Sequence, residues 1–503
     1  AERETDLGGA AVVPGFNDAH NHLVTFGRTL SELSLRAPAV RTLDELYAAV
    51  AARAKEQPTG SWIVGSGYDQ NKLGGHPARD ALDRVAAGHL VWLKHTSGHM
   101  CAVNSAVLER MGAADGDARA PEGGAFGSDE IGRLTGLVQE TAQLLVRDLV
   151  YPYPIDELVA TIAAAAGQLV REGVTSATEA GIGAGWIGSS PVEAAAYAEA
   201  RTRGVLPVRM TLMTSIDAMH DLPAATDDPA RFGIDLGLRS GFGDEWLRLG
   251  PVKLFADGSL IGRTAAMTEP YAGEPDNRGF LQMPAEELTA RILAVRRAGW
   301  QVATHAIGDA ALDVVLDAYA QPVGGAERPH PRHRVEHCAT TRPDQLSRLV
   351  ELGAIPVPQG RFANEIGDGM LDALGPDRAP YCYRQRSFLD AGLVLPGSSD
   401  RPVVNGAPLL GIADLVNQRT SSGRDFNPGE ALTVEQALHA WTVGSAYAVF
   451  DEGRKGTLTP GRLADFVVLS DDLAAVPPAG LADVSVLATV IGGGPVYDAA
   501  GLL

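Results

Sequence analysis

Two histidines, His20 and His22, stand two positions apart just after a short apolar run that Pro14 and Gly15 interrupt. Alternate residues of an extended chain point to the same side, so both imidazoles would face one point beyond the end of a strand. A strand that ends in this way offers two nitrogen ligands to a metal ion. By itself the pair fits two surface histidines in a loop equally well, so the rest of the chain decides between these interpretations.

Other predicted strands end in residues of the same kind. Lys253, His305 and His337 each stand at or near the end of a predicted strand, and Asp400 follows a Gly-Ser-Ser turn. Imidazole and carboxylate together suit Zn²⁺ and, less selectively, Mn²⁺, Fe²⁺ or Co²⁺. Each residue alone is weak evidence, but their shared position at strand ends is strong evidence for a common site. We therefore predict one metal site built from His20, His22, Lys253, His305, His337 and Asp400.

Helices and strands alternate along most of the chain and must position these residues. Helices are predicted at 42–55, 155–172, 191–203, 284–298, 310–320, 343–352 and 384–391. Strands are predicted at 62–65, 90–93, 174–178, 208–214, 247–255, 301–304, 334–337, 354–357 and 393–396. This alternation predicts repeated β-α units with right-handed crossovers.

The fold class that we predict is α/β, a (β/α)₈ TIM-type barrel. Roughly eight strands end in polar residues, and such a barrel carries its chemistry at the carboxyl ends of its strands. A doubly wound open sheet is the alternative, but no Gly-x-Gly-x-x-Gly motif follows a strand to support it. Residues 114–128, rich in Gly, Asp and Ala, are predicted to be a surface excursion.

The end of the chain has a different character. Two turns within 455–465 precede short β-rich runs at 466–469, 484–491 and 495–497, and 7–12 could add an edge strand from the other terminus. We therefore predict a barrel domain over 13–450 and a small β-sandwich-like domain formed by 1–12 and 451–503. Because so little precedes Pro14, we expect part of this small domain to be missing from the sequence or to come mostly from the tail.

The composition limits the partners and the cellular location. The chain has 503 residues, of which 45% are hydrophobic and 21% charged, as in a large globular protein. The formal net charge of −20 argues against nucleic acid or anionic membranes as partners. No apolar run approaches the length of a membrane span. The cysteines are three in number and show no paired spacing: Cys101, Cys338 and Cys382. We therefore expect no disulfide framework, and a reducing cytoplasm is the simplest location.

The sequence around the candidate ligands forms recognisable motifs. They are Pro14-Gly15-Phe16-Asn17-Asp18-Ala19-His20-Asn21-His22, Lys253-Leu254-Phe255-Ala256-Asp257-Gly258-Ser259, Thr304-His305-Ala306-Ile307-Gly308-Asp309, Arg334-Val335-Glu336-His337 and Gly397-Ser398-Ser399-Asp400. Further ones are Asp69-Gln70-Asn71-Lys72 and Gly98-His99 with Asn104-Ser105. Together they resemble the amidohydrolase superfamily, specifically the amidohydrolase-3 branch typified by N-substituted formamide deformylase. The resemblance covers nearly the whole chain.

The resemblance implies a role for each ligand. His20 and His22 would bind the more buried of two metal ions, and His305 and His337 the second. Lys253 would bridge them as a carbamate, because a lysine ammonium has no lone pair to offer, whereas its product with CO₂ is a bidentate carboxylate. The implied cofactors are one or two divalent metal ions, with zinc preferred.

The implied activity is hydrolysis of non-peptide carbon–nitrogen bonds in a small molecule, in linear amides or N-acyl and N-formyl amines. Metal coordination lowers the pKa of water from 15.7 towards about 7. Asp400 would act as the general base and pass a proton to the leaving nitrogen, and His99 would touch the substrate carbonyl. Arg263 and Asp257 would contact the substrate, and a homodimer is compatible with the family.

Several alternatives stay open. The barrel could hydrolyse cyclic amides, carbamates or esters, or it could bind or regulate without turnover. Asp400 could form a helix-capping turn, and His99 could be a satisfied core histidine. Lys253 could be an unmodified lysine paired with Asp257 or Glu179, which would leave a single metal ion. Arg263 could be a solvated loop residue.

Overall fold

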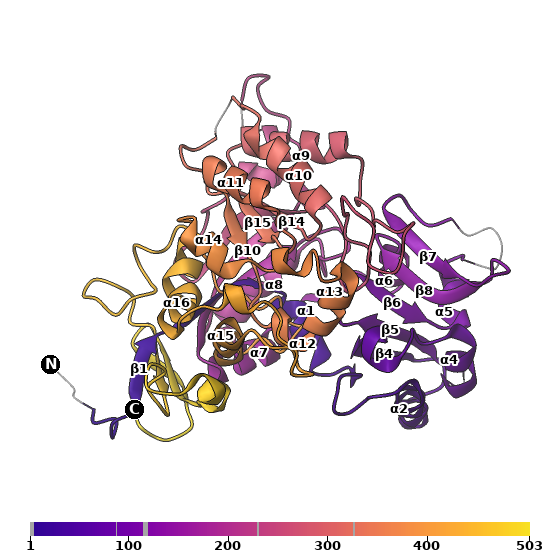
Figure 1. Ribbon diagram of the computed structural model, residues 1–503, viewed down its shortest axis with the longest axis horizontal. Helices are drawn as coiled ribbons and strands as arrows, with labels where there is room; N and C mark the ends of the chain where they lie inside the picture. The colour runs from indigo at the N-terminus through magenta and orange to yellow at the C-terminus, as the bar shows by residue number, and fades with distance from the viewer. Residues whose placement is uncertain (1–4, 87, 114–118, 229–230, 325–326) are drawn as a thin grey trace.

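The computed structural model describes residues 5–86, 88–113, 119–228, 231–324 and 327–503. A seven-stranded sheet forms its centre, in the order β16-β15-β14-β13-β10-β9-β2, and all neighbours in it run parallel. Its strands are β2 (Phe16–Asn21), β9 (Val174–Ile182), β10 (Arg209–Ser215), β13 (Leu247–Phe255), β14 (Val302–Ala306), β15 (Arg334–His337) and β16 (Ile355–Val357). Figure 1 shows this sheet between two smaller ones.

Residues 397–401 close the sheet between its two edge strands. On the β2 side, the N–H of Ala19 donates to the carbonyl of Gly397 (3.0 Å), and the N–H of Asp400 donates to the carbonyl of His20 (2.7 Å). On the β16 side, the Ser398 hydroxyl donates to the carbonyl of Pro358 (3.0 Å). The segment thus takes the place of an eighth strand without a regular ladder. The predicted TIM-type barrel is confirmed.

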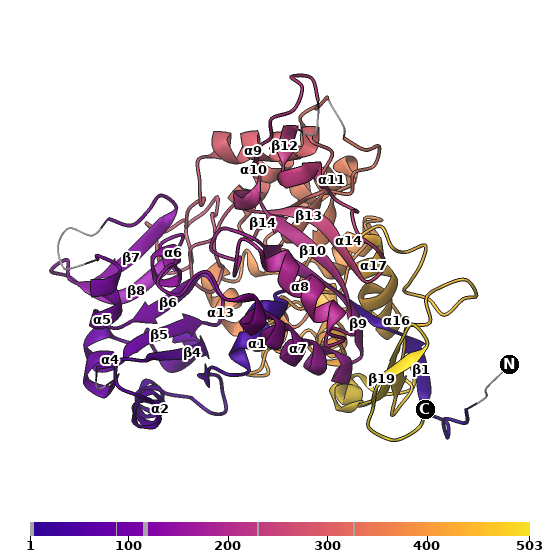
Figure 2. The same cartoon turned by 180° about the vertical axis from the view of Figure 1, so that it is seen from behind.

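Six helices around the barrel, α7 to α11 and α14, occur where the apolar periodicity predicts them, whereas α15 and α16 were not predicted. In α10, the buried residues Leu312, Val315, Leu316 and Tyr319 recur at the spacing of one helix face. Figure 2 shows α7 and α8 on the outer face of β9 and β10. The larger barrel helices are α7 (Ile155–Arg171), α8 (Glu193–Thr202), α9 (Ala285–Arg297), α10 (Asp309–Ala320), α11 (Pro343–Leu352), α14 (Gln385–Asp390), α15 (Pro408–Asn417) and α16 (Val434–His439).

Shorter elements connect these units. The helices are α1 (Leu23–Thr29), α12 (Phe362–Glu365), α13 (Gly367–Leu374) and α17 (Ser445–Tyr447). The small antiparallel pair is β11 (His220–Asp221) with β12 (Phe232–Gly233). α1 directly follows His22 and packs against α7.

A six-stranded sheet, which we call the added sheet, lies beside the barrel, in the order β3-β4-β5-β6-β8-β7. Its strands are β3 (Leu33–Ser34), β4 (Trp62–Tyr68), β5 (Leu90–His95), β6 (Met100–Val103), β7 (Gly124–Ser128) and β8 (Leu134–Glu140). Its helices are α2 (Leu43–Glu56), α3 (Gln70–Leu73), α4 (Arg79–Ala86), α5 (Ser105–Arg110) and α6 (Gln143–Arg147). Thr42 caps α2: its side chain accepts the N–H of Glu45 (3.2 Å).

The predicted division of the chain did not include this sheet. The strands predicted at 62–65 and 90–93 exist, but they pair with each other outside the barrel. Apolar runs identify strands and not the sheet that they join, so the sequence pattern could not assign them. Of the excursion predicted over 114–128, residues 114–118 lie outside the described residues, and Gly124–Ser128 is strand β7.

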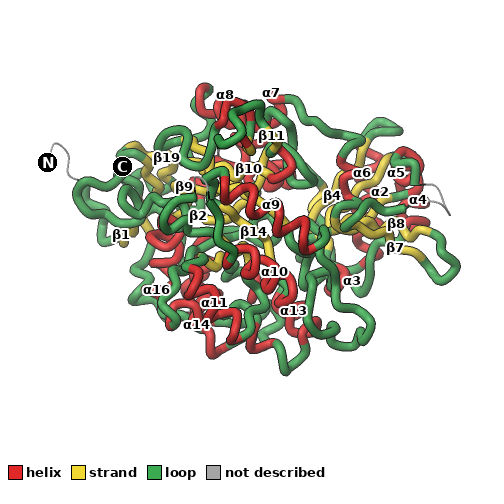
Figure 3. Tube along the Cα trace, turned by 90° about the horizontal axis from the view of Figure 1, so that it is seen from above, coloured by secondary structure: helices red, strands yellow, loops and turns green. Residues whose placement is uncertain are grey.

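Both ends of the chain build the third unit, as predicted. β1 (Ala11–Pro14), β17 (Phe466–Leu469), β18 (Val486–Ile491) and β19 (Gly494–Asp498) form an antiparallel sheet in that order. Over the described residues it is a single four-stranded sheet, whereas the prediction was sandwich-like. Thr489 donates to the carbonyl of Val170 in α7 (2.7 Å), which ties the sheet to the barrel. Figure 3 shows the added sheet and this terminal sheet on opposite sides of the barrel.

Among the helices in the described part of the chain, none combines the length and the apolar character needed to cross a bilayer.

Candidate metal centre

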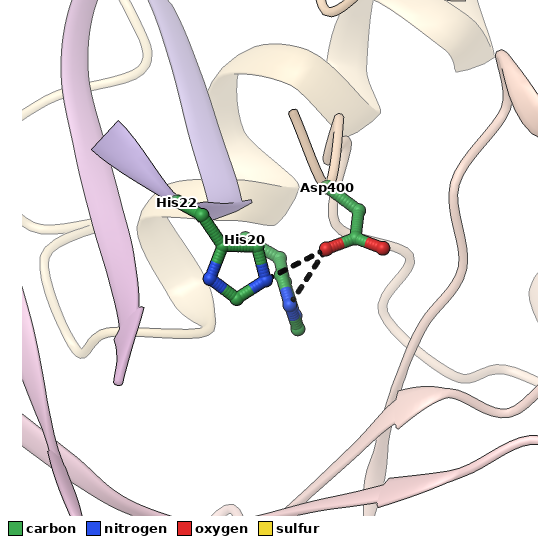
Figure 4. Close-up of side chains that lie close together, drawn as sticks. All are labelled: His20, His22 and Asp400. Atoms are coloured by element: carbon green, nitrogen blue, oxygen red, sulfur yellow. Dashed lines mark ion pairs between the residues drawn. The ribbon is translucent and has the colours of Figure 1, made fainter. Parts of the chain in front are cut away.

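Three of the predicted ligands converge at the open end of the barrel (Figure 4). His20 Nε2 lies 3.2 Å and His22 Nε2 lies 2.9 Å from the same oxygen, Oδ1 of Asp400. Ligand atoms of the three side chains all lie within 4.8 Å of one another. The alternation along β2 turns both histidines to one side, and the hydrogen bond from Asp400 N–H to the His20 carbonyl sets the carboxylate opposite them.

A buried ion pair orients His20. Its Nδ1 forms a short hydrogen bond with Glu336, so Nε2 faces the site. Glu336 in turn accepts from Arg334 Nε (2.7 Å) and Nη2 (2.8 Å), and both residues are fully buried. Burial opposes ionisation, but Arg334 and His20 hold the pKa of Glu336 well below its usual range. A carboxylate behind a histidine in this way fixes the ring of a metal ligand.

The sequence interpretation missed the role of Glu336, although a signal was present. Arg334 and Glu336 stand two apart in a short, fully buried strand, so both side chains point to the same side. Two opposite charges facing one way inside a buried strand are rare unless they pair.

His305 and His337 lie beside the three-residue group. The ring centroid of His337 lies 4.5 Å from that of His305 and 5.2 Å from that of His20. Gln359 binds His337 Nδ1 (2.8 Å), and the Gly258 carbonyl binds His305 Nε2 (2.9 Å). Burial lowers the pKa of His337 to about 3 and that of His305 well below its usual range. Such neutral imidazoles have a lone pair for a metal ion.

Lys253 lies at the same mouth and is buried, with 1% of its surface exposed. Its Nζ makes no hydrogen bond to any described residue, and lies 4.6 Å from the Phe255 ring centroid. The alternative pairing with Asp257 or Glu179 is therefore not seen in the described part of the chain. Burial lowers the pKa of Lys253 to about 8. An unpaired buried ammonium is costly, so the group fits a site whose remaining partner is not a protein residue.

The donor set fits a divalent metal ion. His20 Nε2 is buried and makes no hydrogen bond to any described residue, and its nearest charged neighbour is the other proposed ligand, Asp400, as expected for a nitrogen aimed at a metal ion. Asp400 adds an anionic oxygen: burial opposes its ionisation, but His20, His22 and His337 hold its pKa well below the usual range. Two imidazoles and a carboxylate are a common set of protein ligands for zinc.

Known proteins resemble this chain over nearly its whole length. Residues 3–497 match the family described as Amidohydrolase family. The chain belongs to the amidohydrolase family. It is a metal-dependent hydrolase that acts on carbon–nitrogen bonds.

Individual relatives support this membership. This amidohydrolase is 31% identical to YtcJ of Bacillus subtilis (strain 168), over 98% of this chain and 90% of that protein. It is 26% identical to N-substituted formamide deformylase of Arthrobacter pascens, over 99% of this chain and 90% of that protein. An uncharacterized metal-dependent hydrolase from Pyrococcus horikoshii OT3 superposes with a TM-score of 0.72 at 27% identity, covering 94% of this chain and 89% of the other. The predicted amidohydrolase-3 branch is confirmed.

A pocket of this amidohydrolase lies between the barrel mouth and the added sheet. The barrel contributes His22, Lys253, His305, His337 and Asp400 to its lining. Much of the opposite wall is aromatic, and it comes from the added sheet and from loops: Trp92, His95, His99, Tyr153 and Trp186. Trp186 was not singled out from the sequence, because a tryptophan in a Gly-rich loop has no periodic pattern to identify it.

His99 is on the added sheet side of this pocket. Its Nδ1 binds Glu140 Oε2 (2.7 Å), and its ring centroid lies 5.0 Å from that of His305 and 5.3 Å from that of Trp186. Burial lowers the pKa of His99, but the Glu140 carboxylate outweighs it and raises the pKa above its usual value.

Two predicted substrate contacts are placed elsewhere. Asp257 is fully buried and accepts the N–H groups of Ile307 (3.0 Å), Gly308 (2.7 Å) and Ala266 (3.0 Å). Arg263 forms a short ion pair with Glu274. Neither is among the described residues that line the pocket. A substrate contact for Asp257 or Arg263 stays a prediction that the structure does not test.

Proposed function

We propose that this amidohydrolase cleaves linear amides, N-acyl and N-formyl amines among them, with a divalent metal ion, preferentially zinc, held by His20, His22 and Asp400. The observation that carries the proposal is the convergence of these side chains within 4.8 Å, with a buried His20 Nε2 that makes no hydrogen bond to any described residue. The relation to N-substituted formamide deformylase supports the substrate class.

A bound divalent ion would act as a Lewis acid that polarises the carbonyl and makes water more acidic. The protein supplies the proton transfer. Asp400 lines the pocket, and its Oδ1 lies between His20 and His22, whereas its Oδ2 makes no hydrogen bond to any described residue and lies 4.0 Å from His337 Nδ1. Oδ2 can therefore take a proton from the attacking water and return it to the leaving nitrogen, as a general base and then a general acid.

A second metal ion belongs to the same proposal. His305 and His337 would hold it, and Lys253 would bridge the two ions after its neutral amine adds to CO₂ with loss of one proton, giving a carbamate. The buried Nζ without a hydrogen bond to any described residue supports this modification. Mass spectrometry under native conditions would detect the added CO₂, and Lys253→Ala should lose activity that a short carboxylic acid partly restores. Full activity in Lys253→Ala would contradict the bridging role.

Metal analysis tests the proposed function. Protein purified without chelators should contain one or two equivalents of a divalent transition metal. Chelation should abolish hydrolysis of a panel of N-acyl and N-formyl amines, and added Zn²⁺ or Mn²⁺ should restore it. A metal-free protein whose hydrolysis is insensitive to chelation would refute the proposal.

We propose further that the substrate is a small molecule of the cytoplasm and that neither nucleic acid nor membrane is a partner. The net charge of −20 and the three buried free cysteines support this environment. Cell fractionation tests the location. For the predicted homodimer, light scattering should give twice the chain mass of 52.7 kDa.

A further inference from the structure

Glu140 stands at the junction of the added sheet and the barrel in a conformation that needs support. It ends β8, is fully buried, and has φ of 50°, in the left-handed region that residues with a Cβ seldom adopt. Its N–H donates to the carbonyl oxygen of His99 (2.8 Å). A buried carboxylate on a strained backbone costs free energy, so its neighbours must stabilise it.

Three side chains donate hydrogen bonds to the Glu140 carboxylate. Oε2 binds His99 Nδ1 (2.7 Å) and Gln282 Nε2 (2.9 Å), and Oε1 accepts from Thr264 Oγ1 (2.6 Å). Thr264 and Gln282 lie in the long connection that follows β13, the strand that carries Lys253. Glu140 therefore links the turn that carries His99 to the barrel mouth.

These contacts fix His99 at several points. Its N–H donates to Ser97 Oγ (3.1 Å), its carbonyl accepts from Glu140, and its Nδ1 binds the Glu140 carboxylate. No described residue forms a hydrogen bond with Nε2. His99 lines the pocket next to His305, so Nε2 is the ring nitrogen left for a substrate.

We propose that Glu140 is a positioning residue for the hydrolytic reaction and acts through His99, whose ring it fixes so that Nε2 contacts the substrate. The inference rests on the proposed function, because it takes the substrate to bind between the barrel and the added sheet. A purely structural Glu140 would stabilise the junction without coupling to His99 during turnover.

A double-mutant cycle separates these roles. Glu140→Gln should lower kcat/KM by about 10–100-fold, as losses of ring-orienting partners do, with bound metal unchanged. His99→Asn should lower kcat/KM at least as much. If Glu140 acts through His99, adding Glu140→Gln to His99→Asn should lower kcat/KM little further, because the two residues act as one unit. Losses that multiply in the double variant would overturn the inference.

Gln282→Met is the matched control. It removes one donor to Glu140 and leaves the His99 contact in place, so kcat/KM should fall much less than in Glu140→Gln. If Gln282→Met lowers both the melting temperature and kcat/KM as much as Glu140→Gln does, Glu140 has only a structural role.

A readout without turnover completes the test. In ¹⁵N-histidine NMR of the full chain, Glu140→Gln should shift the Nδ1 resonance of His99, assigned through His99→Asn. An unshifted resonance would overturn the inference whatever the substrate is. A shifted resonance in a protein that hydrolyses no amide would refute the proposed function instead, and would retain the fixing of His99 by Glu140.

Discussion

The barrel and the added sheet, on the two sides of the site, each hold a histidine by the same device but with different supports. In the barrel wall, Glu336 binds Nδ1 of His20 and is itself clamped by the guanidinium of Arg334, and all three side chains are fully buried. The residues belong to β2 and β15, whose backbones are fixed by parallel ladders. A charge-assisted clamp on regular strands leaves little freedom to the ring.

In the added-sheet wall, Glu140 binds Nδ1 of His99, but its other donors are the neutral side chains of Thr264 and Gln282. His99 lies between β5 and β6, and both Thr264 and Gln282 lie in loops. From this difference we infer that the barrel wall would hold the metal ion, whereas the wall formed by the added sheet and the neighbouring loops would select the substrate. Variants in the two walls should therefore fail in different ways.

Asp400→Asn should give the largest effect, and it tests the role of the barrel wall in proton transfer. The amide keeps one ligand oxygen but cannot accept the proton, so hydrolysis should fall by roughly 10²–10⁴-fold, while metal content changes less. Steady-state kinetics with metal analysis measures both. Asp313→Asn, at a surface carboxylate paired with Arg342, is the control and should retain activity. Near-normal turnover in Asp400→Asn would remove Asp400 from the role of base.

Glu336→Gln should reduce metal affinity by about 10–100-fold, because the ring of His20 loses its carboxylate partner. It should also lower the melting temperature, since Arg334 is left with an unpaired buried charge. Titration with zinc and thermal unfolding measure the two effects. Unchanged metal affinity would show that the barrel wall does not depend on this clamp.

Trp186→Ala should act mainly on substrate binding. Trp186 packs on Phe255, with ring centroids 4.7 Å apart, and lines the pocket opposite the metal ligands. We expect KM to rise roughly tenfold, equivalent to ~1.4 kcal/mol, with a smaller change in kcat. Trp246→Ala, at a tryptophan outside the pocket, should leave KM unchanged. A Trp186→Ala variant with normal KM and lowered metal content would break the division of roles between the walls.

Arg263→Gln should have the smallest effect. The Arg263–Glu274 pair is partly exposed, so its loss should lower the free energy of unfolding by less than ~1 kcal/mol. Because Arg263 does not line the pocket, kcat/KM should be unchanged. A large rise in KM for anionic substrates alone would show that Arg263 contacts the substrate after all.

Much of the barrel side could be predicted from the sequence because its signals are local. The period of two in β2 placed His20 and His22 on one side, and the polar residues that close apolar runs marked the strand ends. Helices with a clear apolar face, such as α10, were predicted to within a residue or two of their bounds. Turn residues and apolar periodicity act within a few residues, so they are visible in one sequence.

The wall formed by the added sheet could not be predicted from the sequence, because it depends on contacts between residues that are distant along the chain. Glu140 meets Thr264 and Gln282 across more than a hundred positions, and no spacing along the chain announces these contacts. The strands at 62–65 and 90–93 were recognised, but not the sheet that they join.

The sequence by itself determined which residues can bind a metal ion and that strands would carry them to one end of a barrel. Only the tertiary structure decided that His20, His22 and Asp400 converge most closely, and that Lys253 Nζ has no hydrogen-bond partner among the described residues. It also decided that an added sheet completes the pocket through His99. The physical reason is that residue type and periodicity fix local conformation, whereas convergence depends on how the whole chain packs.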